Sequence, residues 1–158
     1  MNEIIVRREK THLGYPGAAG LIRKAAERTL EAEGIREKCM ISVLLTDDEG
    51  IRRANLEFRQ TDSVTDVLSF PMSELTPGAF RAEDCEKDLD TGSLFLGDIL
   101  IDLARCAQQG EEFGHGFSRE VQYLTTHSVL HLLGYDHTDE GVMKEQMRRR
   151  EKEIMGET

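Results

Sequence analysis

Three histidines near the end of the chain have the spacing of a metal site. They lie in the stretch T-H-S-V-L-H-L-L-G-Y-D-H, residues 126–137, and are three of the five histidines in the protein: His127, His131 and His137. Because His127 and His131 are four residues apart, a helix would place both imidazoles on one face, one turn apart. Glycine commonly ends a helix in a left-handed turn, and a reversal at Gly134 would bring His137 back beside them. The pattern predicts one metal ion bound by three imidazoles.

Such a site would leave one coordination position of the metal for water. Imidazole suits zinc, and three protein ligands leave a fourth position for water, as in catalytic zinc sites. The same spacing occurs in the metzincin peptidases, where a glutamate after the first histidine is the general base. Ser128 stands at that position here and cannot accept a proton near neutral pH. The residues therefore disfavour a metallopeptidase and predict a metal hydrolase with another substrate.

Two further residues are candidates for supporting roles. Arg59 ends a predicted helix, where a cation is favoured by the helix dipole, and its spacing alone favours that structural role. Asp136 precedes His137 and either supports that ligand or shapes the turn. The two remaining histidines, His12 and His115, lie in polar or glycine-flanked stretches and are treated as incidental.

The hydrophobic pattern predicts strands and helices that alternate along the chain. Strands are expected at residues 3–8, 39–46, 64–70 and 94–102, with Pro71 stopping the third. Helices are expected at about residues 16–34, 48–59, 103–113 and 119–133, the last capped by Ser118, and a final helix capped by Thr138 or Asp139 runs to about Met155. Ile51, Leu56 and Phe58 are expected to reach the core, and Gly97 to mark a bulge or a close approach.

Residues 72–93 are expected to form a mobile loop outside the core. The stretch has six acidic and two basic residues, a local net charge of −4, and is unusually long for a connection in a compact domain. Much of the chain's formal net charge of −10 lies here. That charge argues against a protein coated in basic surface, while leaving the histidine site free to be neutral or positive.

Composition limits the class of protein. A chain of 158 residues fits one domain, residues 1–158, and 39% hydrophobic with 32% charged residues is typical of a soluble globular protein. No stretch is apolar enough to span a membrane, and the N-terminus lacks a signal-peptide pattern. The three cysteines are widely spaced and odd in number, which favours reduced thiols and a cytoplasmic location.

Several blocks in order resemble the YbeY family, the bacterial endoribonucleases of ribosomal RNA maturation. They are Arg59 followed by T-D-V-L-S-F-P at residues 65–71, L-G-D-I at residues 96–99, and H-S-V-L-H-L-L-G-Y-D-H at residues 127–137. The resemblance covers roughly residues 41–155, and its histidine block is highly specific. One departure is Ser128, where the family usually has glycine.

The resemblance implies an α+β fold: one domain with a small mixed β-sheet flanked by helices, and a histidine helix like that of the zincins. It implies one zinc ion per chain, held by His127, His131 and His137, and a catalytic Arg59. Asp98 is similar to a position tied to docking on small-subunit ribosomal proteins. The implied activity is cleavage of single-stranded ribosomal RNA, at the 3′ end of the small-subunit RNA, and a part in ribosome quality control.

Alternatives remain open at this point. Besides the metallopeptidase, the chain fits a non-enzymatic ribosome assembly factor whose zinc is structural, with Asp136 or a cysteine as fourth ligand. For a nuclease, the base is either zinc-bound hydroxide or a carboxylate, for which Asp66, Asp98 and Asp136 are the candidates. No oligomeric state is predicted.

Overall fold

The computed structural model describes residues 2–136 and 141–156, in which one mixed β-sheet carries the helices. The strands are β1 (Glu3–Arg8), β2 (Cys39–Thr46), β3 (Val67–Pro71), β4 (Glu86–Lys87) and β5 (Leu94–Asp102). The sheet has the order β1-β2-β5-β3, and β4 also pairs with β5. β1, β2 and β5 are parallel, whereas β3 and β4 run antiparallel to β5. The predicted α+β fold with a small mixed sheet is confirmed.

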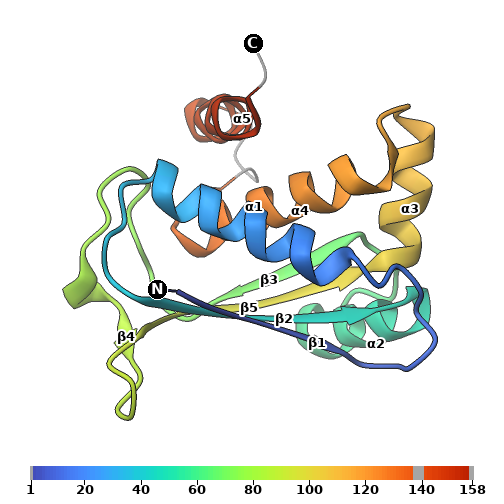
Figure 1. Cartoon of the computed structure of the whole chain (residues 1–158), viewed down its shortest axis with the longest axis horizontal. Helices are drawn as coiled ribbons and strands as arrows, with labels where there is room; N and C mark the ends of the chain where they lie inside the picture. The colour runs from blue at the N-terminus through green and yellow to red at the C-terminus, as the bar shows by residue number, and fades with distance from the viewer. Residues whose placement is uncertain (1, 137–140, 157–158) are drawn as a thin grey trace.

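Helices lie on both faces of this sheet (Figure 1). They are α1 (Ala18–Ala32), α2 (Asp48–Arg59), α3 (Leu103–Glu112), α4 (Gly116–Leu132) and α5 (Val142–Met155), with a short 3₁₀ helix, η1 (Ala82–Asp84). α1 and α4 lie side by side over one face, α2 lies against the opposite face, and α5 lies beyond α1 and α4, away from the sheet (Figure 1). The main core fills the space between the sheet and the pair α1 and α4.

The face under α2 has a much smaller core. It consists of Ile51 on the helix with Leu68 and Leu100 on the sheet. The prediction that Leu56 and Phe58 reach the core is wrong, since they are 50% and 58% exposed. Leu56 lies about 140° around α2 from Ile51. Phe58 is two turns beyond Ile51 on the same side, where its ring meets the Phe70 ring at 5.5 Å, and within the described residues no further helix covers either side chain.

Residues 72–93 are not a loop outside the core, and that prediction is wrong. Their apolar side chains pack against the main core: Leu75, Phe80, Ala82 and Cys85. The two residues of β4 pair with Leu94 and Phe95 of β5. The acidic side chains of the segment face water, and so do Met72 and Leu89, whereas the four apolar residues named above make tertiary contacts that follow no sequence periodicity.

Some boundaries differ from those expected. α4 begins at Gly116, so Ser118 lies inside the helix and His115 takes the N-cap position. Pro71 is the last residue of β3 and does not stop it earlier, because β3 is an edge strand, where proline is tolerated. Thr138 and Asp139, the predicted caps of the last helix, lie outside the described residues, and α5 begins at Val142.

Gly97 marks both a bulge and a close approach, as its place inside β5 predicts. The register between β2 and β5 shifts there, because Met40 pairs with Phe95 while Ile41 pairs with Gly97. Gly97 has a φ of 144°, and a Cβ at this position would overlap the Phe70 carbonyl oxygen. In the part of the chain that the structure describes, no helix is long and apolar enough to cross a membrane.

Candidate functional site

The histidine helix ends in the turn that its glycine predicts. The Gly134 N–H donates to the His131 carbonyl at 3.0 Å, and the Tyr135 N–H donates to the Leu130 carbonyl at 3.1 Å. This pair of bonds, with Gly134 at a φ of 102°, is a Schellman motif. The chain therefore reverses directly after α4. His137, the third predicted ligand, lies outside the described residues.

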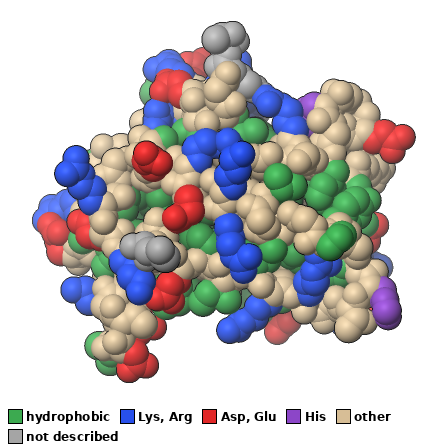
Figure 2. Space-filling view, viewed as in Figure 1, with side chains coloured by type: hydrophobic (Ala, Val, Ile, Leu, Met, Phe, Trp, Pro, Cys, Tyr) green, Lys and Arg blue, Asp and Glu red, His purple; other side chains and the backbone are tan. Residues whose placement is uncertain are grey.

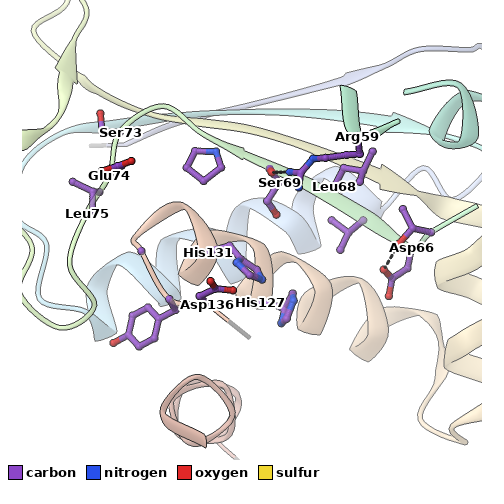
Figure 3. Close-up of a pocket in the computed structure, with 15 residues that line it drawn as sticks. Arg59, Asp66, Leu68, Ser69, Ser73, Glu74, Leu75, His127, His131 and Asp136 are labelled. Atoms are coloured by element: carbon purple, nitrogen blue, oxygen red, sulfur yellow. Dashed lines mark hydrogen bonds between the residues drawn. The ribbon is translucent and has the colours of Figure 1, made fainter. Parts of the chain in front are cut away.

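His127 and His131 line one side of a cavity of about 570 Å³. Their ring centroids are 4.8 Å apart and the rings meet edge to face at 78°. Figure 3 shows both rings on the side of α4 that faces β3. Within residues 2–136 and 141–156, no three His, Cys, Asp or Glu side chains form a metal site. The structure thus brings together the two predicted ligands that it describes.

Glu151 of α5 is a site residue that sequence reasoning missed. Its Oε2 lies 2.5 Å from Nδ1 of His127, and its side chain is 5% exposed. Tyr123 donates its hydroxyl to the other carboxylate oxygen at 3.1 Å. Burial and this carboxylate raise the pKa of Tyr123, so its hydroxyl stays a donor. The available signal was positional, since Glu151 shares the buried stripe of α5 with Met147 and Ile154.

This arrangement fits a metal site. Histidines that bind a metal through one ring nitrogen usually hold a carboxylate, a carbonyl or water with the other. In His127 the carboxylate is on Nδ1, so a metal at this site would be bound through Nε2. Two imidazoles one helical turn apart, one of them braced in this way, suit zinc.

Arg59 lies across the cavity from the histidines, on the wall formed by β3 (Figure 3). Its Nη2 donates to the Ser69 carbonyl at 2.7 Å, and its guanidinium lies 5.2 Å from the centroid of the Phe70 ring. Among the residues that the structure describes, the other guanidinium N–H groups have no hydrogen-bond partner. Arg59 is the last residue of α2, as the helix-end role predicts, and its side chain extends from there to β3, where it donates to the Ser69 carbonyl.

Asp66 also lines the cavity, and a half-buried network centred on the buried Glu120 holds it. With its amide nitrogen turned toward the carboxylates, Gln109 donates to Asp66 at 3.2 Å and to Glu120 at 2.9 Å. Glu120 is 2% exposed, and its other oxygen lies 2.7 Å from Nε2 of His115. His115 is therefore not incidental, because it is the partner of a buried carboxylate.

The other two candidate bases, Asp136 and Asp98, lie in different parts of the structure. Asp136 lines the histidine cavity. Asp98 does not: it is exposed on β5 and lines a groove of about 600 Å³ beside α2. Since its strand neighbour Gly97 contacts Leu132 of α4, the Asp98 side chain points to the other face of the sheet. This placement excludes Asp98 as a base in the histidine cavity.

Ser128 and the cysteines lie outside the cavity. Ser128 is fully buried, and its Oγ has no hydrogen-bond partner in the described part of the chain. Cys39 and Cys106 are buried, and burial raises the pKa of each thiol to about 12, so both stay protonated. None of the three cysteines lines the cavity, which leaves Asp136 as the only one of the proposed fourth ligands on its wall.

The face seen in Figure 2 is not a continuous negative surface, although the chain has a formal net charge of −10. On the face seen in Figure 2, Lys and Arg side chains are spread among acidic and apolar ones. Part of the acid is neutralised in pairs, such as Lys10 with Asp47 at 3.0 Å and Arg52 with Asp62 at 2.6 Å. Arg59 therefore gives the cavity a local cation within a mixed surface.

Comparison with known proteins agrees with the fold and the motif. Residues 4–158 match the model of the family described as Endoribonuclease YbeY. Two proteins named Endoribonuclease YbeY are similar to this chain: that of Clostridium acetobutylicum is 48% identical over 85% of this chain and 84% of its own, and that of Clostridium kluyveri is 45% identical over 85% of each.

A solved structure shows the same fold. The solution structure of TM1509 from Thermotoga maritima superposes with a TM-score of 0.58 at 24% sequence identity, over 97% of this chain and 89% of that one. The family match across nearly the whole chain and the relatives above 40% identity lead to one conclusion: this chain belongs to the YbeY endoribonuclease family.

Proposed function

We propose that this protein is a zinc-dependent endoribonuclease that cleaves single-stranded RNA in the cavity between α4 and β3. One observation carries the proposal: Arg59 and the two histidines face the same cavity from opposite walls. A phosphodiester needs a cation for its charge and an activated water for its cleavage, and these walls supply the residues for both. The relatives named as endoribonucleases support this choice of substrate.

The metal would be held by His127, His131 and His137. When bound, zinc supplies a Lewis acid for a phosphoryl oxygen and lowers the pKa of water from about 15.7 towards 7. His127 and His131 are fixed on one helix, and the Schellman turn at Gly134 reverses the chain after α4.

Arg59 would bind the scissile phosphate. The Ser69 carbonyl holds one N–H of its guanidinium and the Phe70 ring lies beside it, which restricts the plane of the fork. The remaining N–H groups can donate in parallel to two phosphate oxygens, a geometry that lysine cannot reproduce. Charge that develops on the phosphate would then meet a donor that is already oriented.

Two carboxylates on the cavity wall are placed to exchange a proton with water or with the leaving group: Asp66 and Asp136. Asp66 is oriented by Gln109, which ties it to the buried Glu120. A carboxylate held in one rotamer loses less entropy when it acts on a bound substrate.

The biological substrate that we propose is ribosomal RNA at the 3′ end of the small-subunit RNA, with a role in ribosome quality control in the cytoplasm. Docking on small-subunit ribosomal proteins would use the groove that contains Asp98. That groove lies on the other face of the sheet, so a docked protein would leave the cavity open to RNA.

Both alternatives are weaker on specific observations. A metallopeptidase needs a carboxylate next to His127 in the cavity, whereas Ser128 is buried in the core. An assembly factor with structural zinc needs a closed ligand set, and of its proposed fourth ligands the cysteines lie outside the cavity and only Asp136 lines it. Neither alternative requires an oriented arginine opposite the histidines.

The test uses purified protein and three substrates: a single-stranded RNA with the 3′-terminal sequence of small-subunit ribosomal RNA, the same RNA in a duplex, and a casein peptide. We expect cleavage of the single strand only, lost after treatment with a chelator and restored by Zn²⁺. Cleavage that survives complete metal removal would refute zinc dependence. Failure to cleave RNA with any divalent metal would favour the assembly factor.

A further inference from the structure

We propose that Glu151 is a positioning residue that holds the His127 ring with its proton on Nδ1 and so presents Nε2 to the metal. The inference rests on the proposed metal site and adds to it a residue from α5, an element that brings no side chain to the cavity wall. Glu151 does not touch substrate in this account. It acts through His127.

The contact is short, buried and supported from a second side. His127 Nδ1 and Glu151 Oε2 are 2.5 Å apart, and the two side chains are 18% and 5% exposed. The Tyr123 hydroxyl donates to Glu151 Oε1 at 3.1 Å, and the Tyr123 ring lies 5.9 Å from the His127 ring. The carboxylate therefore has one oxygen for the tyrosine and one for the histidine.

α5 is itself anchored next to this contact. Arg150 donates to Glu33 at the end of α1 at 2.6 and 2.8 Å, and to the Ala32 carbonyl at 3.0 Å. The other oxygen of Glu33 accepts the Tyr135 hydroxyl at 2.7 Å, one residue beyond the turn at Gly134. Glu33 thus fixes both the residue before Glu151 and the segment that follows α4, so the approach of Glu151 to His127 does not depend on one side-chain contact.

The chemistry explains why a carboxylate belongs there. A neutral imidazole carries one proton, and the hydrogen bond made by one nitrogen decides which nitrogen keeps a lone pair. A carboxylate accepts only, so Nδ1 must be the donor and Nε2 must be the acceptor that binds metal. The negative charge also makes the ring a better ligand. A role limited to joining α5 to α4 would be met as well by apolar residues, without burying a charge.

The first experiment measures Zn²⁺ affinity of the full chain by competition with a chromophoric chelator. Glu151→Gln keeps the size of the side chain but can donate as well as accept, so it no longer fixes the tautomer. We expect its Zn²⁺ affinity to fall about 10–100-fold, the range for residues that support a metal ligand. Tyr123→Phe should cause a smaller loss in the same direction, because Glu151 stays in place with one donor fewer.

A matched control separates positioning from packing. Ile154→Val removes one methyl from the buried stripe of α5 without touching Glu151. It should lower the unfolding midpoint and leave Zn²⁺ affinity unchanged. If Glu151→Gln binds Zn²⁺ like the parent, or if Ile154→Val weakens binding as much, Glu151 is only a structural contact.

The second experiment needs no metal. Nitrogen-15 shifts of the His127 ring in the metal-free parent, at a pH where the ring is neutral, report which nitrogen carries the proton. We expect the Nδ1–H form in the parent and a mixture of both forms in Glu151→Gln. The Nε2–H form in the parent would overturn the inference. If the parent shows Nδ1–H but binds no Zn²⁺, the proposed metal site fails while the positioning by Glu151 stands.

Discussion

The two faces of the sheet differ in how they are covered. One face lies under α1 and α4, is closed by residues 72–93, and holds the histidine cavity. The other face carries only α2 among the described helices and keeps a core of Ile51, Leu68 and Leu100. Its groove is open and includes the exposed Phe58 beside Asp98.

The two faces also differ in how firmly their polar side chains are held. Side chains on the covered face are held by hydrogen bonds that lead to buried carboxylates. His127 contacts Glu151, and Gln109 joins Asp66 to Glu120. Around the groove the ion pairs are exposed, such as Arg53 with Glu9 at 3.4 Å, and such pairs contribute little to stability. Catalysis requires groups held in place, whereas docking tolerates mobile ones. We therefore propose that cleavage takes place on the first face and docking on the second.

The largest effect should come from Arg59, the residue that α2 brings from the opposite face to the histidine cavity. Arg59→Lys keeps the charge but cannot hold the Ser69 carbonyl and two phosphate oxygens together. By comparison with the loss of one transition-state donor, we expect RNA cleavage to slow by about 2.7–4 kcal/mol in activation free energy. The protein should fold and bind Zn²⁺ as before.

Arg53→Lys is the control, because Arg53 lies on the same helix and lines the groove on the other face. Its cleavage rate should equal that of the parent. Equal slowing in both variants, or unfolding of Arg59→Lys, would show that the arginine serves helix α2 and not the substrate.

The closure of the covered face can be broken at Gly134. A Cβ there would overlap the Leu75 carbonyl oxygen, and the φ of 102° is already unfavourable for alanine. Gly134→Ala should therefore lower the free energy of unfolding by more than about 1 kcal/mol. Gly78, in residues 72–93, has a φ of 71°, but a Cβ there would have no atom within 4 Å. Gly78→Ala therefore measures the backbone cost alone. If urea denaturation gives equal losses in the free energy of unfolding for the two variants, residues 72–93 do not pack on the turn at Gly134.

A pH-dependent difference should arise where β5 leads into α3. Burial, and next the neighbouring Asp48, raise the pKa of Asp102 to about 7. Its unfolded pKa is near 3.9, so between about pH 4 and pH 7 the folded state binds more protons. This carboxyl therefore makes the protein less stable as pH rises through that range. Asp102→Asn, which can still cap α3, should lose that part of the decline in denaturation measured at several pH values.

The smallest effect on the fold should come from the open face. Asp98 is exposed on β5, so Asp98→Ala should change the free energy of unfolding by less than about 0.5 kcal/mol. Cleavage of a short single-stranded RNA should stay at the parent rate, while binding to isolated small ribosomal subunits should weaken. Slower cleavage of the short RNA would contradict the division of roles between the two faces.

Much of the fold could be predicted because local patterns agree with tertiary structure. Residues 39–46 and 94–102 were predicted as strands from continuous apolar runs, and both are central strands of the sheet. Gly134 was predicted at a helix end from its chemistry, and the Gly134 N–H donates to the His131 carbonyl at 3.0 Å in the turn that follows α4. Leu56 and Phe58 failed because periodicity shows an apolar face but not whether another element covers it.

Site residues could be predicted where their spacing in the sequence places them together. They could not be predicted where only the tertiary fold brings them together. His127 and His131 are one turn apart in sequence, so one helix suffices to place them. Glu151 meets His127 only because α5 folds back over α4, and the two are 24 residues apart. The prediction that residues 72–93 lie outside the core failed for the same reason, because their packing on the core depends on contacts distant in sequence.

The most direct measurement of the central claim is elemental analysis of purified parent and His131→Ala proteins, alongside circular dichroism. We expect one equivalent of zinc per chain in the parent and most of it lost in the variant, with the helical signal unchanged. Full retention of the metal by His131→Ala, or a parent that contains no transition metal and binds none when Zn²⁺ is added, would contradict the account.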